Sequence, residues 1–232
     1  KGYVRRPASS LIKGDIVPIK LGAEWTDQDY VKLPTPSSGH YNEIVYNVPS
    51  VLDEDVAEFM GLMVADGTIY NAGFRLMKSS IDVINRFAGL CQKLFNCKVI
   101  HTRNKKTSAV EVNSVYLSRW LKSIGGMNPK NKRVSPFILR SRLSVQARFL
   151  RGLFEDGTAN INARNGCKKL DHIELLTKEH SIFKTVKTML LRFGIVSGRG
   201  RRKAYLKDGP QGTYYMLYIY GVFAHIFRDH IG

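Results

Sequence analysis

Two aspartates in this chain end closely similar apolar segments and are the strongest candidates for chemistry. Residues 59–68 read FMGLMVADGT, and residues 149–158 read FLRGLFEDGT. Each segment brings a carboxylate, Asp66 or Asp156, to a glycine at which a helix can end. Both segments are apolar almost all round, which predicts that the two helices are buried against each other. Two neighbouring carboxylates could hold a divalent metal ion and support phosphodiester hydrolysis.

The second segment differs from the first by one residue. Asp66 follows Gly61 by 66 − 61 = 5 positions, whereas Asp156 follows Gly152 by 156 − 152 = 4. Alignment on Asp-Gly-Thr makes Asp156 the second acid, and this is the alignment that we prefer; alignment on Gly152 leaves Glu155 as the alternative. The two glycines are predicted to let the helix backbones approach closely. An ordinary role as helix-end acids is the competing interpretation of both aspartates.

The composition favours a partner that is a polyanion. The chain has 232 residues, 44% of them hydrophobic, and a formal net charge of +17. Such a charge is typical of proteins that bind nucleic acid, although a basic surface without a specific partner is the alternative. No apolar run approaches the length of a membrane span, and no secretory signal is present, so we expect no membrane partner. The three cysteines, which lack metal-ligand spacing, indicate a reducing intracellular location.

The elements around the two segments also repeat. An acidic first turn at residues 53–55 opens the first helix, and each half then reads α-β-β-α-β-β-α. In the first half we expect a hairpin at 68–78, a helix at 79–95, a hairpin at 98–112 and a helix at 114–124. In the second half we expect strands at 158–163 and 172–176, a helix at 178–193, strands at 195–206 and 213–220, and a helix at 222–231. The predicted units are 1–50, an arm with short strands at 15–19 and 43–46, then repeats at 51–142 and 143–232.

The paired motifs, the repeated topology and the charge resemble the LAGLIDADG homing endonucleases in their single-chain, two-repeat form. The resemblance covers about residues 51–232 and departs at Val64, where the family has an acid. It implies an α+β fold in which the motif helices pack at the centre and two pseudo-symmetric sheets form a DNA-binding saddle. It further implies that divalent metal binds at a site formed by Asp66, Asp156, Gly67 and Glu155. Mg²⁺ or Mn²⁺ would support cleavage, and Ca²⁺ would bind without supporting it.

The family often carries an active-site lysine shortly before a Val/Ile-Pro step upstream of the second motif. Lys132 fits that place with one inserted residue, and a solvated loop lysine is the alternative. The matching position in the second half would lie beyond Gly232. Lys78 and Lys178, at the ends of matching strands, are candidates to serve instead.

Strand side chains are expected to read the major groove of duplex DNA, where each base pair presents a distinct pattern. Candidates in the first half are Tyr70, Asn71, Arg75, Lys78, His101 and Arg103, with Lys105 on phosphate. Candidates in the second half are Asn160, Asn162, Arg164, Lys168, Lys178, Arg199, Arg201, Lys203 and Tyr214. Because strand side chains alternate between faces, only about half of them should face DNA.

The sequence as a whole predicts a monomeric, site-specific endonuclease that makes metal-dependent double-strand breaks in a long non-palindromic target. Residues 4–18 resemble the intein segment that precedes an inserted endonuclease, which implies an intein origin. The sequence contains no phosphate-loop or nucleophile-elbow motif, and its histidines are isolated from one another. It therefore offers no second set of catalytic residues besides the two aspartates. Two alternatives on the same fold remain: a DNA-binding protein that has lost catalysis, and an RNA-splicing maturase.

Overall fold

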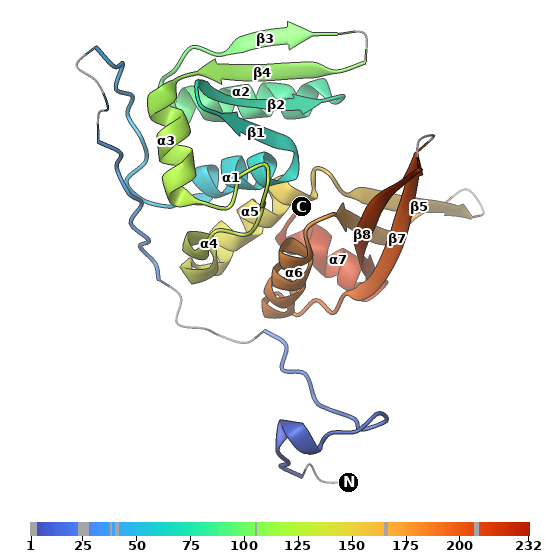
Figure 1. Cartoon of the computed structure of the whole chain (residues 1–232). Coiled ribbons are helices and arrows are strands. Elements are labelled where there is room, and N and C mark those ends of the chain that lie inside the picture. Colours follow the sequence, from blue (N-terminus) through green and yellow to red (C-terminus); the bar gives the residue numbers. More distant parts are fainter. Residues whose placement is uncertain are drawn as a thin grey trace.

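The computed structural model describes residues 4–22, 28–37, 39, 42–104, 106–164, 167–206 and 209–232; the side chains of 162–171 and 204–211 are outside that description. The first repeat contains two hairpins, each followed by a helix (Figure 1). Its elements are α1 (Glu54–Asp66), β1 (Gly67–Tyr70), β2 (Gly73–Lys78), α2 (Ile81–Phe95), β3 (Ile100–Arg103), β4 (Ser108–Asn113) and α3 (Val115–Ile124).

The second repeat follows the same order after a short additional helix. Its elements are α5 (Leu143–Phe154), β5 (Thr158–Arg164), β6 (Cys167–Thr177), α6 (His180–Arg192), β7 (Gly198–Leu206), β8 (Gly209–Tyr220) and α7 (Val222–His230). The additional helix, α4 (Pro136–Arg140), was not predicted, although Ser135 caps it and Pro136 occupies its first position. The predicted α-β-β-α-β-β-α order is therefore confirmed in both halves.

Each half contains one four-stranded antiparallel sheet, with strand orders β1-β2-β4-β3 and β5-β6-β8-β7. α2 packs on β2 and β4, and α6 packs on β6 and β8, so each sheet has one face covered by helices. Alternate residues fill that face: Phe74 and Leu76 of β2 and Leu217 and Ile219 of β8 are buried. The opposite face of each sheet carries the residues that alternate with these.

Polar caps fix the helix starts of the first repeat. The side chains of Asp53, Ser80 and Ser114 accept hydrogen bonds from the third backbone N–H beyond them, at 2.9, 3.5 and 3.1 Å. These bonds satisfy donors that the first turn of a helix leaves unpaired. α1 therefore begins at a fixed residue, which sets the position of Asp66 at its other end.

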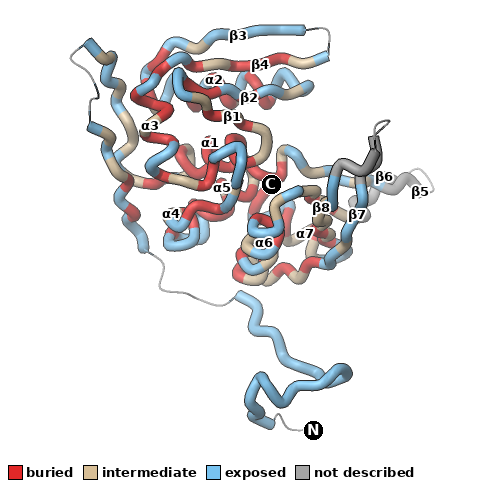
Figure 2. Tube along the Cα trace, viewed as in Figure 1, coloured by how far each residue is buried: buried red, intermediate tan, exposed pale blue. Residues whose placement is uncertain are grey.

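α1 and α5 pack closely at a glycine pair, as predicted. A Cβ added to Gly61 would lie 2.8 Å from the backbone N of Leu153, and one added to Gly152 would lie 2.9 Å from the backbone N of Leu62. Real Cβ atoms do not approach backbone so closely, so only glycine fits at either place. Figure 2 shows buried residues running along both helices, at the centre of the molecule.

The core of the first repeat is built from packed aromatic rings. Phe59 of α1 stacks on Phe87 of α2 with ring centroids 5.3 Å apart, and its edge meets Phe95 at 5.3 Å. Trp120 of α3 lies against Phe95 at 5.4 Å. Edge-to-face and stacked pairs of this kind stabilise the fold beyond their area alone. They anchor α1 to its sheet.

The segment before α1 is mostly exposed in its described parts. Residues 4–22 carry one short 3₁₀ turn, η1 (Ala8–Ser10), and extend away from the sheets (Figure 1). Nearer α1, Val31 and Leu33 are buried in the core, and an isolated bridge pairs Lys32 with Val51. The short strands predicted at 15–19 and 43–46 do not form, because neither segment has a strand beside it to pair with. Among the described residues, no helix is both long and apolar enough to cross a membrane.

Candidate active site and nucleic-acid interface

The carboxylates of Asp66 and Asp156 converge on one ammonium group. Lys78, the last residue of β2, forms an ion pair with Asp66 Oδ2 and lies 3.2 Å from Asp156 Oδ1. Its Nζ also lies 3.4 Å from the backbone O of Glu155, which accepts a hydrogen bond. Lys78 was predicted both as a DNA-binding residue and as a candidate active-site lysine, and the structure places it between the two candidate acids. The two motif copies, 90 residues apart in sequence (156 − 66), therefore meet at one site.

The second motif is one residue shorter than the first, and α5 ends two residues before its acid, Asp156. α1 includes Asp66, but α5 ends at Phe154, and a tight turn carries the chain on. In that turn the N–H of Asp156 donates to Leu153 O at 3.4 Å, and the N–H of Gly157 donates to Phe154 O at 2.7 Å. Asp156 thereby reaches Lys78, although Asp156 follows its contact glycine, Gly152, by four positions and Asp66 follows Gly61 by five.

The charges at this site oppose one another. Burial raises the pKa of Asp156, the charge of Asp66 raises it further, and the ammonium of Lys78 only partly offsets both. For Lys78, burial lowers the pKa, but the hydrogen bond to Asp66 and the charges of Asp156 and Asp66 outweigh burial, and its pKa is raised. The pKa values of Lys78 and Asp156 are thus both raised by their surroundings, and perturbed pKa values of this kind are common where carboxylates bind metal or transfer protons.

A second lysine lies on the other side of the pair. Lys132 leaves the segment between α3 and α4, and its Nζ donates to the backbone O of Ala65 at 3.1 Å. Burial lowers the pKa of Lys132, while the charges of Asp66 and Asp156 act in the opposite direction. The structure brings Lys132 to the acids, as the sequence predicted. Ala65 and Glu155 each precede a candidate acid, so the two ammonium groups contact equivalent carbonyls of the two motifs.

Glu155 is drawn away from this cluster. Its carboxylate forms an ion pair with Arg86 of α2, whose Nε also lies 2.9 Å from Glu58 Oε1. Arg148 of α5 lies 3.4 Å from the other Glu58 oxygen, so the network joins α1, α2 and α5. These contacts hold Glu155 in a structural role and favour Asp156 as the second acid.

The donor set suits a hard divalent ion. Within the described part of the chain, no group of three or more His, Cys, Asp or Glu side chains converges. Mg²⁺ commonly needs only one or two protein carboxylates, because substrate phosphates and water complete its shell. Asp66 and Asp156 meet that need. Gly67 begins β1 opposite Leu76, directly after Asp66, and its place among the ligands stays a prediction.

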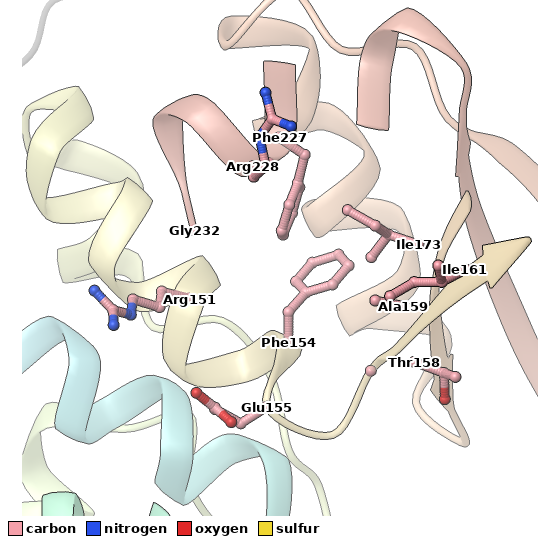
Figure 3. Close-up of a pocket in the computed structure, with 11 residues that line it drawn as sticks. Arg151, Phe154, Glu155, Thr158, Ala159, Ile161, Ile173, Phe227, Arg228 and Gly232 are labelled. Atoms are coloured by element: carbon pink, nitrogen blue, oxygen red, sulfur yellow. The ribbon is translucent and has the colours of Figure 1, made fainter. Parts of the chain in front are cut away.

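A hollow beside the second motif is a poor candidate for a catalytic site. It has a volume of about 440 Å³, and Figure 3 shows Phe154 and Phe227 facing each other inside it, with Arg151 and Arg228 at its edge. Glu155 is the one acid on its described wall, and that carboxylate is held by Arg86. A site that acts on a substrate needs several converging polar groups, and this wall is mainly apolar.

Comparison with known proteins assigns the fold. Residues 144–232 match the model of the LAGLIDADG-like domain. The homing endonuclease I-DmoI, in complex with DNA and calcium, aligns with 77% of this chain and 88% of its own at 17% identity and a TM-score of 0.55. Residues 144–232 are therefore a LAGLIDADG-like domain, and the chain as a whole has the LAGLIDADG fold. DUF199/WhiA from Thermatoga maritima shares the fold at 20% identity and a TM-score of 0.53, over 80% of this chain and 58% of that chain.

The LAGLIDADG chain also matches segments of two much longer kinds of curated protein. It is 30% identical over 187 residues to the alpha subunit of the ribonucleoside-diphosphate reductase NrdEB of Bacillus subtilis, and the match covers 69% of this chain. It is 29% identical over 98 residues to one subunit of the A-type ATP synthase of Pyrococcus abyssi, covering 42% of this chain. The matched segment spans only 17% and 9% of the length of these relatives.

The open face of the first LAGLIDADG sheet presents polar side chains. Tyr70 donates a hydrogen bond to Glu111 and lies 3.2 Å from Asn113 Oδ1. Burial, together with Glu111, raises the pKa of Tyr70. Arg75 is exposed and pairs with Glu111 across the sheet. Tyr70 and Arg75 were predicted to face DNA, and the strand register places both on the open face.

Other first-half candidates lie elsewhere. Asn71 sits in the exposed β1–β2 turn, where its Oδ1 accepts a hydrogen bond from Lys122 at 3.0 Å. His101 pairs with Val110 and Arg103 pairs with Ser108, both buried on the helix side of the sheet. Register therefore turns His101 and Arg103 away from the open face. The sequence could not show this, because all residues of β3 are exposed and their pattern does not reveal which side faces α2. Lys105 lies outside the described residues.

The second open face is aromatic. Asn160 contacts His172 Nε2 at 2.8 Å, and the His172 ring lies 5.1 Å from Tyr220. Tyr218 stacks on Tyr220 at 5.6 Å. Of this group only Asn160 was predicted. The sequence did hold a signal for Tyr218 and Tyr220, because they flank the apolar Ile219 in a strand and so must face the side opposite to it. Glycines of β7 leave room for the rings, since a Cβ on Gly200 would lie 3.0 Å from Tyr218 Cε2.

The remaining predicted residues of the second half divide between the two faces. Lys178 lies over the ring of Tyr214, with its Nζ 5.1 Å from the centroid, so these two contact each other at the open face. Lys178 was also expected to match Lys78, but the last residue of β6 is Thr177, and this threonine occupies the equivalent place. Arg199, Arg201 and Lys203 pair with Leu217, Tyr215 and Thr213, which puts them on the helix side. The side chains of Asn162, Arg164 and Lys168 are outside the described part.

Proposed function

We propose that this LAGLIDADG protein is a metal-dependent endonuclease that makes a double-strand break at a specific duplex DNA site. One observation carries the proposal: Asp66 and Asp156, from separate motif copies, converge at the ends of two helices that touch through glycines. Asp66 is the last residue of α1, and Asp156 lies in the hydrogen-bonded turn that follows α5; such fixed positions matter because small displacements of catalytic groups cost rate. Two acids related by the repeat offer one for each DNA strand.

The residues around the acids supply the remaining chemistry. Bound Mg²⁺ or Mn²⁺ would polarise the scissile phosphate and lower the pKa of an attacking water. Asp66 and Asp156 would hold the ion, and Ca²⁺ would occupy the site without supporting cleavage. Solved I-DmoI complexes contain calcium or manganese, which supports the use of a divalent ion. Lys78 and Lys132 bring positive charge to where the phosphorane-like transition state gathers negative charge.

Recognition would use two unlike surfaces. Tyr70, Asn71 and Arg75 would read one half-site through hydrogen bonds, and Asn160 with the neighbouring rings would read the other. Because the two faces differ, the target is expected to be non-palindromic. The net charge of +17 supports duplex DNA as the partner through phosphate contacts, with affinity that falls as salt rises.

A mobile intein-borne origin is part of the proposal. The curated relatives are named for two unrelated activities, yet each shares only a segment with this chain. A segment that recurs in unrelated hosts is expected of an inserted element. The protein would act as a monomer on genomic DNA inside the cell, using its internal repeat in place of a dimer axis.

A DNA-binding protein without catalysis is the second candidate, and one observation favours it. The second half has Thr177 where the first has Lys78, so no cation at that place adds to the charge around the acid pair. Such a protein would keep its site affinity and fail to cut, or would cut one strand.

The first experiment is cleavage of a supercoiled plasmid library of randomised inserts, with Mg²⁺, with Ca²⁺ and with EDTA. Linear product at one recurring sequence with Mg²⁺ alone is the expected result. Retention of a recurring sequence on the protein without any cut, in all three conditions, would establish the binding protein instead. Nicked circles without linear product would show that one acid is inactive.

A further inference from the structure

A basic hollow lies on the outer side of the second sheet, between α6 and β7. Its volume is about 560 Å³, and its described lining contains no acidic residue. Lys184 and Lys187 enter from α6, and Arg199 and Arg201 enter from β7. We call this the α6–β7 pocket. It is on the helix side, so it is distinct from the open face proposed to contact duplex DNA.

Among the described residues, no carboxylate forms an ion pair with any of the four cations of the α6–β7 pocket. Other exposed lysines such as Lys98 and Lys130 are also without an ion pair in the described part of the chain, so the distinguishing feature of the pocket is that four cations gather around one hollow. Like charges around a hollow repel each other and oppose folding. An anionic ligand would relieve that repulsion.

Aromatic rings form one wall of the same pocket. Tyr215 of β8 stacks on His180 with centroids 4.6 Å apart and an interplanar angle of 25°. Phe183 of α6 lies 5.8 Å from Tyr215, and the Arg201 guanidinium lies 5.7 Å above the Tyr215 ring. His180 is exposed at the end of this stack. Cations beside a stack with an exposed ring are the combination that binds single-stranded nucleic acid.

The first repeat carries different residues at the equivalent positions. Asn85 and Ala88 of α2 match Lys184 and Lys187, which are the fifth and eighth residues of their helices. Ile81 stands where the second repeat has His180. The two lysines and the exposed histidine are therefore properties of the second repeat, whereas on the strand the first repeat has His101 and Arg103 where the second has Arg199 and Arg201.

We propose that the α6–β7 pocket binds a single-stranded segment of nucleic acid, with its phosphates on Lys184, Lys187, Arg199 and Arg201 and a base stacked on His180. At about 560 Å³ the hollow has the volume of a small-ligand site. A strand here would lie outside the saddle, so the protein could hold duplex and single strand together. The proposal does not depend on cleavage.

The test is fluorescence anisotropy in EDTA with a labelled oligothymidylate, with an RNA oligomer of equal length, and with a labelled duplex. The variants are Lys184→Gln with Lys187→Gln, and, as a matched charge control, Lys98→Gln with Lys130→Gln, two exposed lysines of the first repeat. Losing two phosphate contacts should weaken single-strand binding about 10-fold and lower the salt slope by about 1.4. The control should leave both unchanged, and thermal melting should show both variants folded.

A second measurement separates the pocket from the saddle. With the selected duplex in excess, the single strand should still bind, and Lys184→Gln with Lys187→Gln should leave plasmid cleavage unchanged. Equal losses in the control variant, or complete competition by duplex, would overturn the proposal. A loss of duplex affinity equal to the loss of single-strand affinity would also overturn it and make the pocket a contact for flanking duplex. Stronger binding of RNA than of DNA would support it and identify RNA as the natural source of the strand. Failure of plasmid cleavage with wild-type protein would refute the proposed function and leave this result standing.

Discussion

The two repeats share a backbone plan but differ in chemistry. β2 ends in Lys78, which joins both acids, and β6 ends in Thr177, whose hydroxyl accepts a hydrogen bond from the backbone N–H of Glu179 at 3.1 Å. The first repeat and the segment after it therefore provide both ammonium groups, because Lys132 follows α3. The second repeat provides the second carboxylate and the basic outer pocket. The repeated fold thus fixes the positions of the side chains, while the residue types at those positions determine the charges and hydrogen bonds of each half.

The largest expected effect comes from the acids, one from each half. Asp66→Asn and Asp156→Asn should each abolish double-strand cleavage, lowering the rate by more than about 100-fold because a metal ligand is lost. Binding of the target duplex in Ca²⁺ should remain within a few fold. Plasmid linearisation and duplex anisotropy measure the two quantities. Cleavage at the wild-type rate in either variant would refute the assignment of that residue.

The lysine difference between the halves gives the next largest effect. Lys78→Met should lower the cleavage rate about 100-fold, since one preorganised charge beside the reacting phosphate is lost. Thr177→Met, at the equivalent place, should change the rate less than about 3-fold, because no charge is removed there. Single-turnover plasmid cleavage at saturating protein compares them. Equal losses in the two variants would mean that position in the fold, and not charge, is what matters there.

The helix crossing should tolerate no side chain on either half. Gly61→Ala forces a Cβ against the backbone of α5 and should lower the free energy of unfolding by about 1–3 kcal/mol. Gly89→Ala is the control, because Gly89 lies in α2 with open space around it. That change should raise stability by about 0.4–1 kcal/mol. Urea unfolding followed by circular dichroism gives both values, and a stabilised Gly61→Ala would show that the helices can separate without loss.

The smallest effect concerns the pH dependence of stability. The raised pKa of Asp156 means that the folded chain binds its proton more readily than the unfolded chain, so this carboxylate destabilises the fold above its folded pKa. Without metal, Asp156→Asn should raise the melting temperature by about 1–2 °C at neutral pH, and the gain should shrink as pH falls. Asp229→Asn, exposed on α7, is the control. A lower melting temperature for Asp156→Asn in EDTA would contradict the sign.

Local patterns predicted the elements well because their causes are local. The Asp-Gly ends, the serine caps at Ser80 and Ser114, and the 3.6-residue spacing of α2 all act within one turn of chain. The glycine pair could also be anticipated, because two wholly apolar helices with one small residue each have few other ways to pack. α4 was missed although Ser135-Pro136 is a typical helix start, since it lies within a segment interpreted only for its lysine.

Side-chain placement was harder to predict where pairing decides it. His101, Arg103, Arg199 and Arg201 lie on edge strands whose alternation is nearly all polar, and only the register with β4 and β8 shows their face. Lys78 was offered as a DNA contact and as a candidate active-site lysine, but its position between two acids depends on contacts 12 and 78 residues away along the chain (78 − 66 and 156 − 78). No sequence window of ordinary length holds that information.

The glycine contact between α1 and α5 has a consequence for how such a protein can change. Gly61 and Gly152 lie in the buried crossing of the two helices, and this crossing positions the chain ends that carry Asp66 and Asp156. In the proposed endonuclease, substitutions on the open faces would alter the preferred DNA sequence and leave the geometry of the acid pair unchanged. The surface would then be free to evolve toward new sites, while the buried crossing would preserve the geometry of the break.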